Sequence, residues 1–146
     1  MSAIDIAGLD HVVLRVRDLD AALAFYRDGL GCPVERRLDE LGLVQLRAGR
    51  SLIDLVPLGS PLGKNGGAGP GDEGRNMDHF ALTLTGFDEP ALRAALEAAG
   101  IEPGDVATRY GAEGQGPSMY LRDPDGNVVE LKGPPSDPGG LRSEGR

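Results

Sequence analysis

The sequence has few of the residues on which several common classes of protein depend. It contains no Trp, three Phe and three Tyr, which leaves little aromatic surface for stacking a large flat ligand. Its single cysteine, Cys32, has no second thiol in the chain with which to form a disulfide. No segment approaches the roughly 18 consecutive apolar residues that a membrane-spanning helix requires. We therefore expect neither a disulfide scaffold nor a membrane protein.

Positive charge is also scarce. The 15 Lys and Arg residues are outnumbered by 23 Asp and Glu residues, which gives a formal net charge of −8. This balance disfavours nucleic acid and anionic membrane surfaces as partners, because both attract basic proteins. The first residues carry neither the basic region nor the apolar stretch of a secretion signal. These observations favour an ordinary soluble cytoplasmic protein.

Histidine occurs twice, in two matching phrases. His11 stands in Leu-Asp-His-Val and His79 in Met-Asp-His-Phe, and each phrase opens a segment with the alternation of a strand. Each half of the chain also has one acid inside a later apolar segment. These acids are Asp54 in Leu-Ile-Asp-Leu and Glu130 in Val-Val-Glu-Leu. The repetition predicts a duplicated module with one His and one carboxylate in each copy.

The periodicity of each half predicts the same order of elements, which is βαβββ, so the expected fold class is α+β with paired modules. The first half has strands near 9–16, 33–38, 43–47 and 52–57, and a helix that ends at Gly31. The second half has strands near 78–84, 107–110, 118–122 and 127–132, and a helix over 89–99. Asp18 or Asp20 can cap the first helix, and Asp88 can cap the second. A tight turn is expected at 123–127, with positive φ at Gly126.

These elements divide the chain into five parts. We expect an N-terminal lead at 1–7, a first module at 8–58, a glycine-rich linker at 59–76, a second module at 77–133 and a flexible tail at 134–146. Each module alone would bury too little apolar surface to be stable. The modules must therefore pack against each other or against another subunit.

The repeated ionisable residues share a position relative to the core. His11, His79, Asp54 and Glu130 each lie on the strand face opposite the strongly apolar side chains, where they can line a cavity. Two imidazoles and two carboxylates would suit one divalent ion such as Zn²⁺, Ni²⁺, Co²⁺, Mn²⁺ or Fe²⁺, with positions left for water or substrate. Taken singly, a strand His is more often a hydrogen-bonded residue than a ligand. The symmetric recurrence favours a metal site.

The combined motifs resemble the vicinal oxygen chelate superfamily, also called the glyoxalase/bleomycin resistance/dioxygenase group, over residues 8–133. The motifs that carry the resemblance are His11-Val-Val-Leu-Arg-Val-Arg-Asp-Leu, Phe25-Tyr26, Leu30-Gly31, His79 and Asp123-Pro-Asp-Gly-Asn-Val-Val-Glu130-Leu. The resemblance implies modules that curl into an eight-stranded mixed sheet around a central cavity, one divalent metal ion, and commonly a homodimer. Whether the site is built within one chain or across a dimer interface stays open.

Within that group the first and last segments look most like glyoxalase I. The resemblance implies that His11, His79 and Glu130 are metal ligands and that Asp54 stands where that enzyme has a glutamate. It further implies a lyase or isomerase that acts on a small oxygenated, possibly thiol-conjugated metabolite through a metal-stabilised enediolate. Glu130 is the first choice for the catalytic base and Asp54 the second. Arg15 matches a substrate-binding arginine.

Other segments favour different branches of the group. Arg109, Ser118 and Tyr120 resemble substrate-binding residues of less characterised glyoxalase-domain proteins and, in part, of the fosfomycin-modifying branch. An extradiol-type dioxygenase would need only the two His and Glu130, although no further His is present as an acid or base. A fosfomycin-type thiol transferase and a metal-free bleomycin-type binding protein are the remaining alternatives. The few aromatic residues disfavour the binding protein.

Overall fold

The computed structural model describes residues 3–136, which form two modules with the same order of elements. In the first module the strands and helices are β1 (His11–Val16), α1 (Leu19–Leu23), η1 (Ala24–Gly29), β2 (Val34–Leu38), β3 (Leu43–Ala48) and β4 (Ser51–Pro57). In the second they are β5 (Phe80–Thr83), α2 (Glu89–Ala98), β6 (Val106–Gly111), β7 (Gly114–Arg122) and β8 (Val128–Lys132). A short 3-10 turn, η2 (Gly63–Gly66), interrupts the linker. The predicted tail lies largely outside the described residues.

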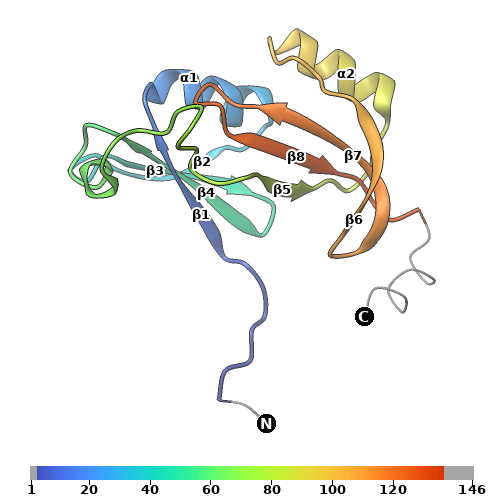
Figure 1. Ribbon diagram of the computed structural model, residues 1–146, viewed down its shortest axis with the longest axis horizontal. Coiled ribbons are helices and arrows are strands. Elements are labelled where there is room, and N and C mark those ends of the chain that lie inside the picture. The colour runs from blue at the N-terminus through green and yellow to red at the C-terminus, as the bar shows by residue number, and fades with distance from the viewer. Residues whose placement is uncertain (1–2, 137–146) are drawn as a thin grey trace.

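Both modules contain a four-stranded mixed sheet of one topology (Figure 1). The strand orders are β1-β4-β3-β2 and β5-β8-β7-β6, with a parallel pair at β1–β4 and again at β5–β8. This confirms the α+β class and the paired βαβββ modules. The eight strands do not form one curled sheet within the chain, because β1 and β5 are edge strands of separate sheets.

The local signals for the helices are borne out. The Asp18 carboxylate accepts from the Ala21 amide, so Asp18 rather than Asp20 caps α1, and Asp88 caps α2 in the same way. The first helix then continues as the π-helix η1, a widened turn that the sequence did not reveal. Gly31 ends it with φ of +78°, a conformation that a side chain would disfavour.

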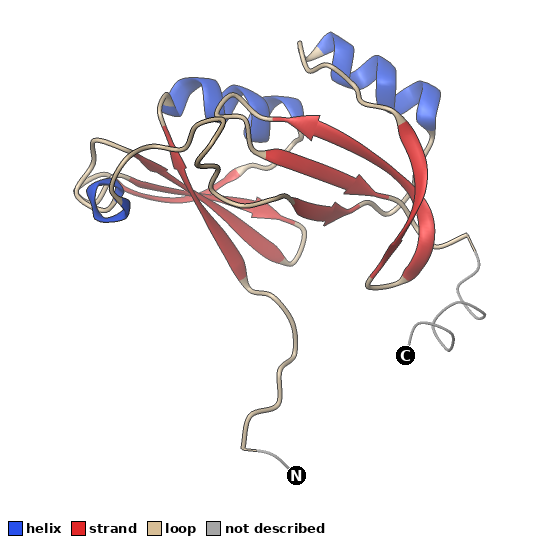
Figure 2. Cartoon of the chain, in the orientation of Figure 1, coloured by secondary structure: helices blue, strands red, loops and turns tan. Residues whose placement is uncertain are grey.

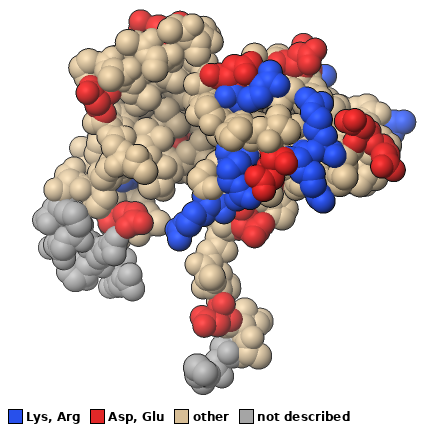
Figure 3. Space-filling view, turned by 180° about the vertical axis from the view of Figure 1, so that it is seen from behind, with Lys and Arg blue, Asp and Glu red and all other residues tan. Residues whose placement is uncertain are grey.

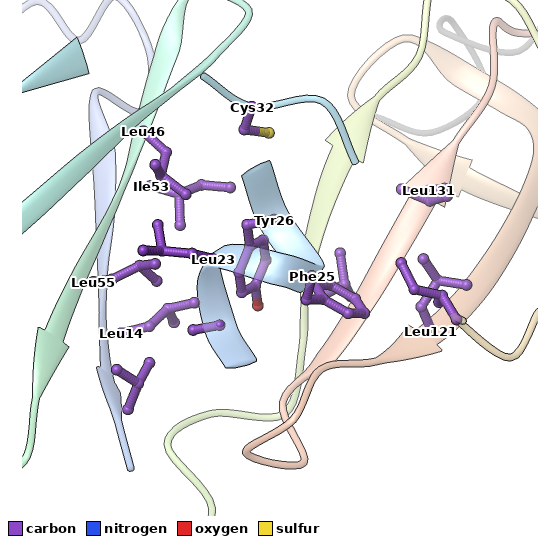
Figure 4. Packing of buried hydrophobic residues seen from close by; sticks show 14 of the residues in the cluster. Leu14, Leu23, Phe25, Tyr26, Cys32, Leu46, Ile53, Leu55, Leu121 and Leu131 are labelled. Carbon is purple, nitrogen blue, oxygen red and sulfur yellow. The ribbon is translucent and has the colours of Figure 1, made fainter. Parts of the chain in front are cut away.

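The first helix fills the space between the two sheets (Figure 4). Leu14, Leu46, Ile53 and Leu55 of the first sheet lie on one side of it, and residues of β7 and β8 lie on the other, all in one buried cluster. In the view of Figure 2 the strands lie below both long helices. The two modules therefore share one buried core. No helix in the described range 3–136 is long and apolar enough to cross a membrane.

The predicted turn at 123–127 connects the modules. Buried Tyr26 of η1 donates its hydroxyl proton to Oδ2 of Asp123 over 2.6 Å. Oδ1 of Asp123 accepts from the amides of Asp125 and Asn127, and Gly126 has the expected positive φ of +82°. The Arg17 amide at the end of β1 donates to Oδ1 of Asp125. The turn therefore acts as a polar seam between the first helix, β1 and the second sheet.

Candidate metal centre

The structure brings His79 and Glu130 together on the second sheet. His79 immediately precedes β5, and Glu130 lies on β8, the hydrogen-bonded neighbour of β5. Nε2 of His79 is 3.2 Å from Oε1 of Glu130, which is a buried carboxylate. Two atoms that bind one ion at about 2.0–2.1 Å lie roughly 3.0–3.4 Å apart, so this separation fits a shared ligand pair. We call these two residues the second half-site.

His11 and Asp54 form the corresponding pair on the first sheet. Asp54 on β4 lies opposite Val13 of β1, and Val13 is two residues from His11, so the imidazole and the carboxylate share one face. Asp54 is 3% exposed, whereas the His11 side chain is 46% exposed. The hydrogen bond to Asp10, and next the negative charge of Asp54, raise the pKa of His11. We call His11 and Asp54 the first half-site.

Each His is oriented by the aspartate that precedes it. Nδ1 of His11 is 2.8 Å from Oδ1 of Asp10, and Nδ1 of His79 is 2.6 Å from Oδ2 of Asp78. The hydrogen bond with His79 lowers the pKa of Asp78. Such a carboxylate holds the Nδ1 proton and leaves Nε2 as the ligand atom. The repeated Asp-His phrase is the signal of this arrangement in the sequence.

A row of polar side chains across three strands supports Asp54. Nε2 of Gln45 on β3 donates to both carboxylate oxygens of Asp54, at 3.2 and 3.1 Å. Nε of Arg36 on β2 donates in turn to Oε1 of Gln45 over 2.8 Å, which fixes the orientation of the amide. The neutral amide of Gln45 therefore binds Asp54, and the guanidinium of Arg36 fixes the orientation of that amide. Neither Gln45 nor Arg36 was indicated by sequence, because their register with Asp54 depends on the strand pairing.

The other predicted residues of the second module surround its half-site. The guanidinium of Arg109 lies 4.3 Å from the centre of the Tyr120 ring, and Tyr120 meets His79 edge to face at 5.4 Å. Nη1 of Arg109 also donates to Oγ of Ser118 over 2.6 Å. The three predicted substrate-binding residues Arg109, Ser118 and Tyr120 are therefore neighbours on the face that carries Glu130.

One further residue of this face was missed. Lys132, two positions after Glu130 on β8, is only 6% exposed, and its ammonium donates to the carbonyls of Gly114 and Gly133. Among residues 3–136, no carboxylate lies within ion-pair distance of Lys132. The alternation along β8 could have indicated its position, but a lysine beside a turn normally suggests solvent exposure.

Arg15 is placed differently from its predicted neighbours. Its guanidinium donates to carbonyls of the linker, namely those of Gly63, Gly66, Gly67 and Ala68. These contacts hold the glycine-rich segment against β1. A substrate-binding role for Arg15 stays a prediction, since its donors are already engaged with the backbone.

The two half-sites are not joined within one chain. In the described part of the molecule, no group of three or more His, Cys, Asp or Glu side chains is arranged to hold a metal ion. Each half-site offers one imidazole nitrogen and one carboxylate, which are ligands that suit the borderline-hard divalent ions. The donor chemistry therefore fits a metal, but one chain supplies only two of the four donors at either place.

The arrangement defines a class of proteins built from paired βαβββ modules with a His and an acid in each. Residues 8–131 match the Glyoxalase/Bleomycin resistance protein/Dioxygenase superfamily, and the chain belongs to this family. The family match extends over both modules and includes both half-sites.

Individual relatives are distant. The chain is 27% identical over 128 residues to virulence protein STM3117 of Salmonella typhimurium, across 84% of this chain and 81% of that protein. It is 29% identical over 136 residues to a putative lactoylglutathione lyase of Brassica oleracea var. gemmifera, across 88% of this chain but 45% of that protein. An integron cassette protein from V. cholerae has a similar structure, with a TM-score of 0.68, 28% identity, and coverage of 90% of this chain and 98% of that one.

Proposed function

We propose that this protein is a metal-dependent lyase or isomerase of the glyoxalase I type whose metal site is assembled from two copies of the chain. His11 and Asp54 of one copy would join His79 and Glu130 of the other around one divalent ion. The observation that supports this most directly is the existence of two matched half-sites, each with an oriented imidazole and a buried carboxylate. A site with four donors requires one first half-site and one second half-site, and two symmetry-related copies of the chain can bring them together.

The free edges of the sheets support the same arrangement. β1 and β5 each have a strand partner on one side only, so their other backbone groups are available for pairing. Each of these strands adjoins the His of its own module. Pairing of β1 with β5 of a second copy would create the eight-stranded curled sheet that the sequence predicted and would bring unlike half-sites together. Two such junctions form in a twofold dimer.

The chemistry expected at the site follows from its side chains. A divalent ion held there would act as a Lewis acid on neighbouring oxygens of the substrate. Glu130, in contact with His79 and shielded from water, is positioned to move a proton next to the substrate carbonyl. Tyr120 and Arg109 would form one wall of the pocket, and Ser118 would supply a hydroxyl. The substrate class is a small molecule with vicinal oxygens.

Metal analysis and turnover test the proposal together. The protein should be stripped with chelator, reloaded separately with Zn²⁺, Ni²⁺, Co²⁺, Mn²⁺ and Fe²⁺, and assayed with hemithioacetals. We expect one ion per chain and metal-dependent isomerisation. The His11→Ala and His79→Ala variants should each lose the ion, whereas Tyr110→Phe, at an exposed position of β6, serves as the control. Full metal loading in either His variant would contradict the proposal.

One observation favours a second candidate, thiol transfer to an anionic small molecule. Such a reaction needs cationic groups that hold the anion, and Lys132 and Arg109 both lie on the face of Glu130. Ser118 separates them, since it is the strand partner of Lys132 and accepts from Arg109. A thiol-dependent loss of an epoxide phosphonate, without isomerisation of hemithioacetals, would favour this candidate over the first.

A further inference from the structure

The segment before β1 exposes a set of large aliphatic side chains. We call residues 3–10 the N-terminal arm. All of them are exposed, with Ile4 at 75%, Ile6 at 82% and Leu9 at 89%. Figure 1 shows the arm leaving the start of β1 and running away from both sheets. Aliphatic side chains gathered on one short segment are typical of a surface that another molecule covers.

A cleft between the modules offers an apolar surface of suitable character. It measures about 700 Å³, and its apolar lining includes Leu30, Leu82, Leu84 and Leu92. The four consecutive residues 81–84 all line it. Because successive strand residues point to opposite faces, a surface that all four share must lie along the free edge of β5. We call this surface the inter-module cleft.

We propose that the inter-module cleft binds the N-terminal arm of a second copy of the chain. The inference rests on the two-copy arrangement proposed above. If β1 of one copy pairs antiparallel with β5 of the other around a shared ion, His11 lies beside His79 of the second copy, and the residues before His11 run along β5 toward its end. The arm that precedes His11 then runs past Thr83 and Leu84, where the cleft is located.

The pattern of the arm agrees with this occupant. Ile4 and Ile6 are two residues apart, so an extended arm places both on one face and Asp5 on the other. Within its own chain the arm leaves its aliphatic side chains exposed, so they do not fill the cleft of the same copy.

A disulfide trap tests the contact directly. The probe is the full chain with Ile6→Cys and Leu84→Cys in a Cys32→Ser background, oxidised mildly and run on a non-reducing gel. We expect a covalent dimer. A disulfide within one chain would mean that the cleft binds the arm of the same copy. The absence of any disulfide would mean that the cleft does not bind the arm. Either result overturns the proposal.

Matched variants control the trap. Ile6→Cys alone should stay monomeric on the gel, because a covalent dimer there would mean that two arms meet each other rather than the cleft. Ile6→Cys with Tyr110→Cys, which is half exposed on β6 and outside the cleft, should also give no dimer. A dimer in either control would contradict the assignment of the arm to the cleft.

The energetic test separates this inference from the proposed function. Ile4→Asp with Ile6→Asp should raise the dimer dissociation constant at least about tenfold in sedimentation experiments. Leu41→Asp, at an exposed position in the turn between β2 and β3, should leave it unchanged. If the arm variant dimerises as tightly as the unmodified protein and still binds one ion per chain, the arm inference fails and the function stands. If the unmodified protein is monomeric and binds no metal, both fail.

Discussion

The two modules share strand order, helix cap and Asp-His pair, but they surround their half-sites differently. In the first module a polar row of Arg36, Gln45 and Asp54 crosses the sheet. In the second, His79 is packed against the Tyr120 ring and contacts Glu130 directly. On the face seen in Figure 3, Lys and Arg gather over the first module, with acidic side chains among them. The two modules thus place a His and an acid at corresponding positions but surround them with different side chains.

The two half-sites therefore differ in their exposure and in the side chains that contact the acid. The proposed function assigns proton transfer to the second half-site, because it combines a shielded carboxylate, an imidazole and an aromatic ring. The first presents a half-exposed imidazole and a carboxylate held by an amide, which suits a ligand pair without a proton-transfer role.

The largest effect is expected from Glu130→Gln. The amide can no longer accept a proton, so turnover should fall at least about a hundredfold. Asp54→Asn should cost less turnover at saturating metal, because Asp54 is assigned to binding. Steady-state kinetics of both variants, with metal content measured in parallel, check this. Near-normal turnover of metal-loaded Glu130→Gln would remove Glu130 from its role as base.

The next largest effect is expected at the 123–127 turn that joins the two modules. Tyr26→Phe removes a buried donor to Asp123 and should lower the free energy of unfolding by about 2 kcal/mol, the scale of a hydrogen bond to a charged group. Urea unfolding measures this, with Tyr110→Phe as an exposed control. An unchanged midpoint for Tyr26→Phe would show that the modules do not depend on this contact.

Gln45→Leu tests the polar row of the first module. Loss of the donor that orients Asp54 should weaken metal binding by about tenfold, since residues that support ligands have effects of this size. Competition with a chelating dye measures the affinity, and Gln115→Leu on β7 is the matched control. Equal affinities for the two variants would mean that Asp54 needs no support from Gln45.

The smallest effect concerns Asp125 at the seam. Burial raises the pKa of this carboxyl above its ordinary value, and its Oδ2 has no hydrogen-bond partner among the described residues. The folded state therefore binds the proton more tightly than the unfolded state, and stability falls as pH rises through the raised pKa. Asp125→Asn should lack this loss, so its stability relative to the unmodified protein should increase between acidic and neutral pH. A pH-independent difference in urea unfolding would contradict it.

Much of the fold could be predicted because its signals are local. The caps at Asp18 and Asp88 and the glycines at 31 and 126 each depend on a few neighbouring residues, and the structure confirms them. The π-helix η1 has no such signal, since it depends on how Phe25 and Tyr26 pack between the sheets. The separation into two sheets also depends on long-range packing, which periodicity does not report.

The structure places one His and one acid on a common face in each module, whereas their binding of a metal stays a prediction. Repetition indicated His11, Asp54, His79 and Glu130, and strand alternation placed each on the correct face. The support from Gln45 depends on the register of β3 against β4, and the buried position of Lys132 depends on how the residues after β8 fold back over β7. Such contacts between distant segments leave no pattern in a single sequence.

The most direct test of a site shared between two copies is complementation between His11→Ala and His79→Ala. Each variant alone should bind no metal and show no turnover. After unfolding and refolding together, half of the dimers should be mixed and each mixed dimer should regain one of its two sites, so metal content should reach about a quarter of the unmodified value. Recovery of metal and activity near this level confirms assembly from two chains. No recovery in mixtures shown to contain mixed dimers would contradict it.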